Sequence, residues 1–308
     1  MTLIWGTNFS IVKSAFTEIA PQAFNVVRMV IASGVFLAII VSIRRRAPGA
    51  AEPPVDGGDA FAGIFHTPAP VTRRDWLALI ALGIVGHALY QYFFIGGLAR
   101  TSVANSSLML AATPVVIALM GAALGQDRPA PLHWIGAALS MAGIYIVVGQ
   151  GAALKVEELA GDAMMFAAVC CWAVYTLGSR HLMVRHSPVG VTGLSMAIGT
   201  LFYVPLAWNE LRRADWSAVS AGTYVALGYS AIFALCVAYT IWYVAVRQIG
   251  SARTSVYSNV VPLVAMMTAV VFLDEPLSAS KVVGAGAVLV GVALTRVGRT
   301  RIAIPAEQ

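Results

Sequence analysis

The stretch that decides the class of fold is Asp75–Leu98, DWLALIALGIVGHALYQYFFIGGL. Apart from Asp75 at its first position, it contains no Asp, Glu, Lys or Arg. A helix needs about 20 mostly apolar residues to cross the hydrocarbon core of a bilayer, so this stretch is long enough for one span. A β-barrel would instead show short strands of alternating character. The stretch therefore predicts a transmembrane α-helix.

The rest of the chain has the same composition. Of its 308 residues, 59% are hydrophobic and 11% are charged, and the mean hydropathy is +0.79. Soluble domains contain about 25% charged residues, so a water-soluble globular enzyme and a disordered protein are excluded. We predict an all-α polytopic membrane protein with about ten transmembrane helices, at residues 2–20, 22–43, 75–98, 102–124, 132–150, 161–181, 188–208, 218–246, 252–273 and 279–297.

Two segments depart from this regular pattern. Residues 44–74 are rich in Pro and Gly and are bounded by arginines, which predicts a flexible loop outside the bilayer. The first span is barely long enough to cross and contains Lys13 and Glu18. We expect the true start of the protein to lie upstream of Met1; the alternative is a helix that thins the bilayer.

The basic residues predict the orientation through the positive-inside rule. With the N-terminus in the cytoplasm, the inner segments hold 13 of the 20 Lys and Arg residues and the outer segments hold 5. We expect an integral protein of the bacterial plasma (inner) membrane with both termini in the cytoplasm. Nucleic acid is not an expected partner, because no basic helix is interleaved with aromatic residues.

The chain contains an internal repeat. Trp5 matches Trp172 at an offset of 167 residues, and Pro114 matches Pro262 at an offset of 148 residues. We divide the chain into two five-helix repeats and a cytoplasmic tail, at residues 1–150, 151–297 and 298–308. Because five is odd, the second repeat enters the membrane from the opposite side. Inverted repeats recur in secondary transporters, which bind substrate between the halves; the alternative is a duplication that built only a structural bundle.

Lys13 and Arg28 are the two basic residues that lie inside spans and more than two residues from a span end. A charge inside a span costs roughly 2.5–3.5 kcal/mol on insertion scales, so such residues usually face a cavity or a partner. Facing the interior, both residues would attract a substrate carboxylate. The alternatives are snorkelling to the interface or an ion pair with Glu18.

His87, Tyr90 and Gln91 share one face of the third span, because residues three and four apart lie on the same side of a helix. Histidine titrates near neutral pH. This polar and aromatic face predicts part of a cavity wall. The alternative for His87 is a hydrogen-bonded residue within the helix packing.

The fourth and ninth spans carry matching polar residues around a proline. Proline removes a backbone donor, which is tolerated where neighbouring helices or cavity water satisfy the freed carbonyl. Paired prolines predict paired bends around a site; the alternative is helix contact through small hydroxylated residues. The bends are expected at Pro114 and Pro262, and the candidate cavity residues beside them are Asn105, Tyr257 and Asn259.

Aromatic side chains form a further group of cavity candidates, Trp5, Trp172, Tyr175, Tyr239 and Trp242. Trp and Tyr are common at the membrane interface, which is the alternative. The equivalence of Trp5 and Trp172 in the repeat favours the cavity. An aromatic cavity would suit amphipathic metabolites or cations.

The sequence lacks the motifs of an enzyme. There is no P-loop and no H-E-x-x-H motif, and Cys170, Cys171 and Cys236 have neither metal-binding nor disulfide spacing. We therefore expect no catalytic residue, no metal and no cofactor. Small-residue faces around Gly136 and Gly284 predict close helix contact, either between the halves or between the protomers of a homodimer.

These residues resemble the drug/metabolite transporter superfamily, specifically its EamA-like ten-helix group. The resemblance rests on Trp5-Gly6-Thr7-Asn8-Phe9 with Lys13, on Arg28, on the segments Ala104–Pro114 and Ala252–Pro262, and on Asp274–Leu277. It adds Asn8 to the cavity candidates. The family implies export of metabolites or amino acids through a central cavity.

We therefore expect a secondary transporter of small molecules that works by alternating access within a lipid bilayer. The alternatives are a subunit of a lipid-linked-sugar flippase or a membrane protein that transports nothing. A membrane-embedded enzyme is disfavoured by the missing catalytic groups.

Overall fold

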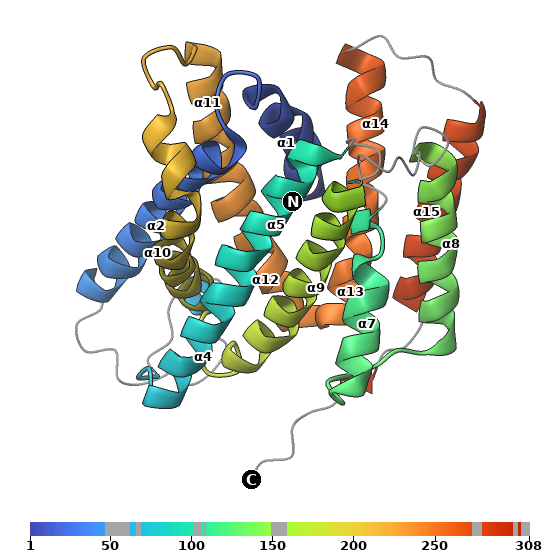
Figure 1. Ribbon diagram of the computed structural model, residues 1–308. Coiled ribbons are helices and arrows are strands. Elements are labelled where there is room, and N and C mark those ends of the chain that lie inside the picture. Colours follow the sequence, from blue (N-terminus) through green and yellow to red (C-terminus); the bar gives the residue numbers. More distant parts are fainter. Residues whose placement is uncertain are drawn as a thin grey trace.

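The computed structural model describes residues 1–46, 62–65, 69–101, 106, 109–148, 159–272, 279–297 and 301–302. Nearly all of these residues are helical (Figure 1). The elements are α1 (Thr2–Ala15), α2 (Pro21–Arg46), α3 (Ala62–Phe65), α4 (Arg73–Gly83), η1 (Ile84–Leu89), α5 (Tyr90–Arg100), α7 (Thr113–Ala123), β1 (Asp127–Arg128), α8 (Pro131–Val148), α9 (Leu159–Leu182), α10 (Pro188–Arg213), α11 (Ala221–Tyr229), η4 (Ser230–Val237), α12 (Ala238–Ile249), α13 (Ser251–Val256), η5 (Tyr257–Val260), α14 (Val261–Phe272), α15 (Ala279–Val297) and β2 (Arg301–Ile302).

In the described part of the chain, five helical stretches are long and apolar enough to cross a membrane. Three shorter apolar helices accompany them, at Thr113–Ala123, Pro131–Ile146 and Val282–Thr295. The protein is therefore a polytopic, helical membrane protein, as its composition predicts. The long stretches are Pro21–Arg45, Arg73–Arg100, Leu159–Leu182, Pro188–Arg213 and Ala221–Ile249.

The first two helices differ from the predicted spans 2–20 and 22–43. Helix α1 ends at Ala15, and α2 begins at Pro21 and continues to Arg46. Proline is favoured at the first position of a helix, and it disfavours helical geometry in the residue before it. The chain must therefore leave α1 before Ala20, which makes the first helix shorter than predicted.

The predicted loop 44–74 is shorter than expected. Arg44–Arg46 belong to α2, α4 begins at Arg73, and Ala62–Phe65 form one helical turn between them. Thr72 caps α4, since its side chain accepts from the backbone N–H of Asp75 and the Asp75 carboxylate accepts in return from Thr72.

Two long membrane helices contain a π-helical segment near their middle. The segment η1 lies between α4 and α5, and η4 lies between α11 and α12. Short π segments interrupt the regular ladder of hydrogen bonds and are frequent at functional sites. The predicted ninth span is also interrupted, since the 3-10 turn η5 separates α13 from α14.

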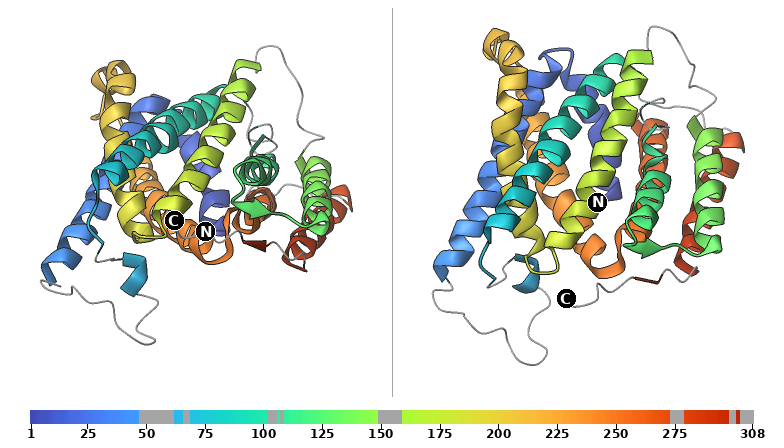
Figure 2. Two further views of the ribbon diagram at one scale, coloured as in Figure 1. Left: turned by 90° about the horizontal axis from the view of Figure 1, so that it is seen from below. Right: turned by 60° about the horizontal axis from the view of Figure 1, so that its bottom comes forward.

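Helix pairs from distant parts of the chain pack side by side. Helix α2 packs against α10, and α8 packs against α15 at one flank of the bundle (Figures 1 and 2). A Cβ atom at Gly136 would lie 2.5 Å from the carbonyl oxygen of Gly291, and one at Gly143 would lie 2.6 Å from that of Gly284. These glycines let the two backbones approach closely. The small-residue faces thus meet within one chain.

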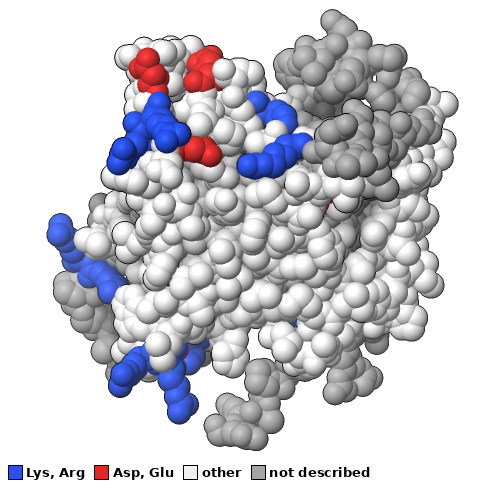
Figure 3. All heavy atoms as spheres, in the orientation of Figure 1, with Lys and Arg blue, Asp and Glu red and all other residues white. Residues whose placement is uncertain are grey.

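Charged side chains gather at two rims of the molecule. Figure 3 shows Lys, Arg, Asp and Glu above a broad belt that carries almost none on the visible face, and Lys and Arg below it. The turns between α1 and α2 and between α10 and α11 lie at the upper rim, and the turn between α9 and α10 lies at the lower rim (Figure 1). Such a belt is the surface expected of a protein that lies in a bilayer.

Candidate functional site

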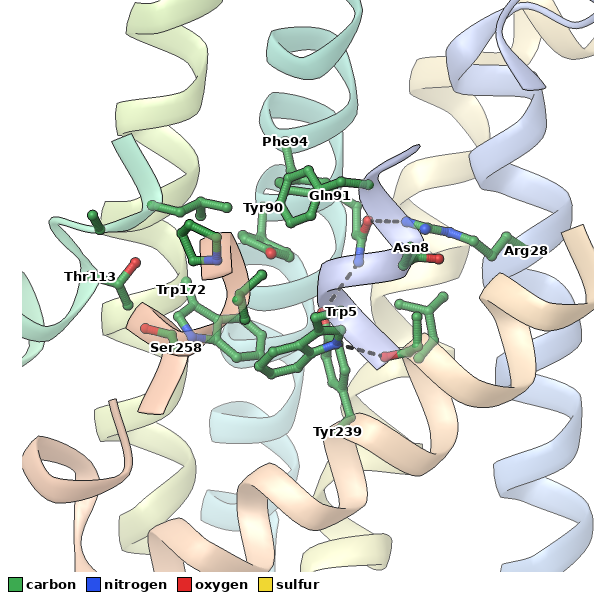
Figure 4. A pocket seen from close by; sticks show the side chains of 17 residues that line it. Trp5, Asn8, Arg28, Tyr90, Gln91, Phe94, Thr113, Trp172, Tyr239 and Ser258 are labelled. Atoms are coloured by element: carbon green, nitrogen blue, oxygen red, sulfur yellow. Dashed lines mark hydrogen bonds between the residues drawn. The ribbon is translucent and has the colours of Figure 1, made fainter. Parts of the chain in front are cut away.

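A cavity of about 80 Å³ lies where several helices converge (Figure 4). This volume holds a few water-sized groups. Side chains from both halves of the chain line it. They are Trp5, Asn8, Phe9, Arg28, Tyr90, Gln91, Phe94, Leu110, Ala111, Thr113, Trp172, Ala234, Leu235, Tyr239, Ser258, Val261 and Pro262.

Arg28 is the charged residue of this cavity, and its side chain is 1% exposed. Its guanidinium donates to three neutral side chains, through Nε to Asn25 Oδ1 at 3.0 Å, Nη1 to Ser230 Oγ at 2.8 Å and Nη2 to Gln91 Oε1 at 2.8 Å. Arginine has five N–H donors, so two remain. Within the described ranges, no carboxylate forms an ion pair with Arg28.

A buried cation without a counter-ion is costly, because the protein interior screens charge far less than water does. The three neutral acceptors reduce this cost and fix the plane of the guanidinium. They leave its positive charge uncompensated. The two remaining donors are the groups with which Arg28 could bind an anion, since a carboxylate accepts hydrogen bonds from a guanidinium.

Gln91 connects Arg28 to the opposite wall of the cavity. Its Oε1 accepts from Arg28, and its Nε2 donates to the hydroxyl of Tyr239 at 3.2 Å (Figure 4). Because both ends of the amide are used, the orientation of Gln91 is fixed by its partners. Arg28, Gln91 and Tyr239 thus form one hydrogen-bonded chain.

Aromatic rings form the second wall. The ring centroids of Trp5 lie 5.9 Å from Trp172 and 6.1 Å from Tyr239, both edge to face, and the indole N–H of Trp5 donates to Ala234 O at 3.1 Å. Tyr90 packs against Trp172 at 5.1 Å. Such pairs are stabilising in edge-to-face or offset arrangements. The aromatic wall offers an apolar surface to a ligand held by Arg28.

Asn8 lies beside Arg28 at the edge of the cavity (Figure 4). Its side chain is 6% exposed, and its Oδ1 has no hydrogen-bond partner among the residues that the structure describes. An unsatisfied buried acceptor costs about 1–3 kcal/mol. This amide is therefore a polar group that a ligand or water would satisfy.

His87 and Tyr175 do not line the cavity, although the sequence predicted both there. They form a separate buried group behind Tyr239. His87 Nε2 and the Tyr175 hydroxyl both hydrogen-bond Ser195 Oγ, at 3.2 and 2.7 Å. Trp242 is also behind the wall, where it packs against Trp5 and Trp172 at 5.5 Å each.

Lys13 lies away from the cavity. Its ammonium donates to the backbone carbonyls of Leu98 and Thr101, at the carboxyl end of α5. Cations are favourable there because the last carbonyls of a helix carry partial negative charge. Glu18 does not pair with Lys13; its carboxylate accepts from the N–H and hydroxyl of Ser220.

The predicted fourth and ninth spans contribute to the cavity other residues than Asn105, Tyr257 and Asn259. Asn105 lies outside the described residues. Asn259 donates to Ser140 Oγ at 2.8 Å, and Tyr257 packs with the cluster between α14, α8 and α15. Pro114 and Pro262 each occupy the second position of a helix, α7 and α14, so each marks the start of a helix.

The cavity includes residues that sequence reasoning missed. Phe94 lies three and four positions after Gln91 and Tyr90, so its place on the same helical face was available from spacing alone. Ser258 lines the cavity instead of its neighbours, because the tight turn η5 changes which residue faces inward. The others are Phe9, Leu110, Ala111, Thr113, Ala234, Leu235 and Val261.

Comparison with known protein families identifies a family model that matches this chain. The model of the EamA-like transporter family matches residues 1–149 and 159–297. The chain belongs to the EamA-like transporter family.

Several relatives of this chain are named as transporters. The uncharacterized transporter YyaM of Bacillus subtilis (strain 168) is 27% identical over 233 residues, which cover 75% of this chain and 76% of that protein. An uncharacterized transporter of Archaeoglobus fulgidus is 27% identical over 295 residues, 95% of this chain and 93% of its own. A crystal structure with 19% identity shares the fold, with a TM-score of 0.73 over 96% of this chain and 93% of that one.

Proposed function

We propose that this protein is a secondary transporter that exports amino acids or related small carboxylates through the cavity at Arg28. The observation that carries the proposal is the buried guanidinium with neutral partners and two remaining donors. A substrate carboxylate would supply the missing negative charge. The aromatic wall of Trp5, Trp172 and Tyr239 would hold an apolar substrate side chain.

We further propose that ten spans form two inverted repeats related by a pseudo-two-fold axis through this cavity. Residues that lie on a two-fold axis must contact their own equivalents. At the offset of 167 residues, Ser33 Oγ hydrogen-bonds Thr200 Oγ1 at 2.9 Å. At the offset of 148 residues, Gln91 hydrogen-bonds Tyr239. Trp5 likewise contacts Trp172.

Other features support the same symmetry. The π segment η1, shifted by 148 residues, overlaps η4. The close contact of Gly136 with Gly291 has its symmetry mate in the contact of Gly143 with Gly284. Inverted repeats allow a transporter to alternate by exchanging the conformations of its two halves around a fixed site.

We also propose that the lower rim, with Arg185 and Arg247, faces the cytoplasm of a bacterium. The described lower ends of α2, α4, α9 and α12 carry Arg44, Arg45, Arg73, Arg74, Arg180 and Arg247, whereas the upper ends of α5 and α10 carry Arg100, Arg212 and Arg213. Such an asymmetry follows the positive-inside rule.

Counterflow in proteoliposomes tests this function. Vesicles loaded with unlabelled members of a panel of amino acids and their 2-oxo acids are diluted into a trace of the labelled compound. We expect uptake that the corresponding amino alcohol, which lacks the carboxylate, does not inhibit. Arg28→Gln should abolish this uptake, whereas Arg212→Gln, a change at an exposed rim residue, should leave it intact. Movement of a labelled lipid without counterflow of any panel member would contradict the proposal.

A further inference from the structure

Behind the cavity wall, His87 forms a polar cluster that substrate recognition by Arg28 does not use. His87 is fully buried in η1, where its ring lies 4.6 Å from Tyr175 on α9 and stacks on Tyr239 on α12 at 5.8 Å. Its Nε2 faces Ser195 on α10. The titratable groups that contact the imidazole are these two tyrosines, and no carboxylate of the described part of the chain contacts it.

The hydrogen bonds indicate which nitrogen of His87 is free. Ser195 Oγ has one proton, which it donates to the carbonyl of Thr192 at 3.2 Å. With this proton used, we assign Ser195 Oγ as the acceptor of the hydrogen bonds from the Tyr175 hydroxyl and from His87 Nε2–H, since this arrangement satisfies all three contacts. With the proton on Nε2, Nδ1 carries a lone pair, and Nδ1 has no partner in the described structure. Nδ1 is therefore a buried base that can bind one proton.

His87 is connected to Arg28 through two intervening residues, Tyr239 and Gln91. Its ring stacks on Tyr239, which is bonded to Gln91, and Gln91 accepts from Arg28. His87 and Gln91 are four residues apart on one helical stretch, which places their Cβ atoms about 5–6 Å apart. A proton on His87 would therefore place a second positive charge close to Arg28 in a poorly screened interior.

We propose that His87 binds the proton that travels with the substrate, so that the protein carries a carboxylate anion and a proton together. The inference rests on the proposed function. A proton from the open aqueous side binds Nδ1 while the substrate carboxylate neutralises Arg28, and both leave on the other side. Each makes binding of the other more favourable, because the anion removes the repulsion between the two cations, and this linkage is reciprocal. Export down the substrate gradient then carries protons outward.

The effect of a membrane potential on this transport follows from the net charge that moves with the substrate. A 2-oxo acid anion that moves with one proton moves no net charge, so a membrane potential should not drive its transport, whereas a zwitterionic amino acid that moves with one proton moves one positive charge. The π segment η1 gives the histidine a place where the helix ladder is already irregular and can change between the two conformations of the transporter.

Proteoliposomes that contain a pH dye test the inference with α-ketoisocaproate, the 2-oxo acid of leucine, as the probe. We expect the wild-type protein to acidify the lumen when an inward gradient of the probe is imposed, above the level of protein-free vesicles. His87→Gln should lose this acidification and keep probe–probe counterflow, which shows that it is folded and binds substrate. His181→Gln, a change at an exposed histidine, should behave as the wild type.

Ser195→Ala provides a second variant if His87→Gln does not fold. It removes the partner of Nε2, so the pH at which coupled transport is half-maximal should shift while counterflow persists. The inference is overturned if wild-type counterflow proceeds without proton movement, or if His87→Gln still acidifies the lumen as the wild type does. Absence of Arg28-dependent counterflow in the wild type would instead contradict the proposed function itself.

Discussion

At the scale of single residues, Arg28 determines the chemistry of the cavity. Its side chain is held by Asn25, Ser230 and Gln91, which are all neutral. A permanent carboxylate partner would have produced a structural ion pair. Neutral partners instead orient the guanidinium and leave its charge available for a ligand.

The substitution Arg28→Lys keeps the positive charge and changes the geometry of the hydrogen-bond donors. An ammonium cannot make the same planar, two-pronged contact, and it cannot hold all three neutral partners. The loss of one hydrogen bond to a charged group is worth about 1.5–3 kcal/mol, so we expect the half-saturation concentration to rise roughly tenfold to a hundredfold. Counterflow at varied substrate concentration measures this. An unchanged value would show that the guanidinium does not hold the substrate.

Much of the site followed from the cost of burying charge and from helical spacing. These arguments identified Arg28, Tyr90 and Gln91, all of which line the cavity. They did not separate Arg28 from Lys13, because the role of Lys13 depends on where α5 ends next to it in space. Spacing along one helix says nothing about that contact.

At the scale of elements, the interruptions of the helices are the informative features. The cavity is lined by residues of η4 and η5 and by the first turn of α5, which follows η1. Apolar length predicted where the long helices run. It did not predict the π and 3-10 segments, because these depend on close contacts between helices.

One such contact is testable at Gly86 in η1. A Cβ atom there would lie 2.1 Å from the ring of Tyr175, so Gly86→Ala must displace that ring. Overpacking of this kind costs about 1–3 kcal/mol. We expect a lower melting temperature in detergent. Gly34→Ala is the matched control, because nothing lies within 4 Å of its new methyl group. Equal melting temperatures for both variants would contradict the tight packing of η1.

The turn between α1 and α2 predicts a pH effect. Hydrogen bonds from the backbone N–H and then the hydroxyl of Ser220 hold the pKa of Glu18 below its ordinary value of 4.5. A lowered pKa stabilises the folded protein above pH 4.5, and this contribution is lost as the pH falls through the lowered value. Glu18→Gln should therefore melt below the wild type at pH 7, and the gap should close in acid. A gap that stays constant from pH 7 to pH 3 would show that the Glu18 charge has no role.

At the scale of the whole molecule, the cavity lies where residues that the proposed repeat makes equivalent meet. Trp5 touches Trp172, and Gln91 bonds Tyr239, across a separation in sequence that equals the repeat offset. The offset was visible in the sequence. The sequence could not predict that these matching residues contact one another, because the contact depends on how the two halves are placed relative to one another. The account therefore predicts a site that each face of the membrane reaches in turn.

Thiol labelling of Ser258 tests this alternation most directly. Ser258 lines the cavity, so Ser258→Cys, in a variant without Cys170, Cys171 and Cys236, reports its accessibility. An impermeant thiol reagent is applied to intact cells and to inside-out vesicles, with Arg185→Cys as a control that should react from one side. The account predicts that Ser258→Cys reacts from both sides and is protected from both by a transported substrate. Reaction from one side under all conditions would contradict alternating access through this cavity.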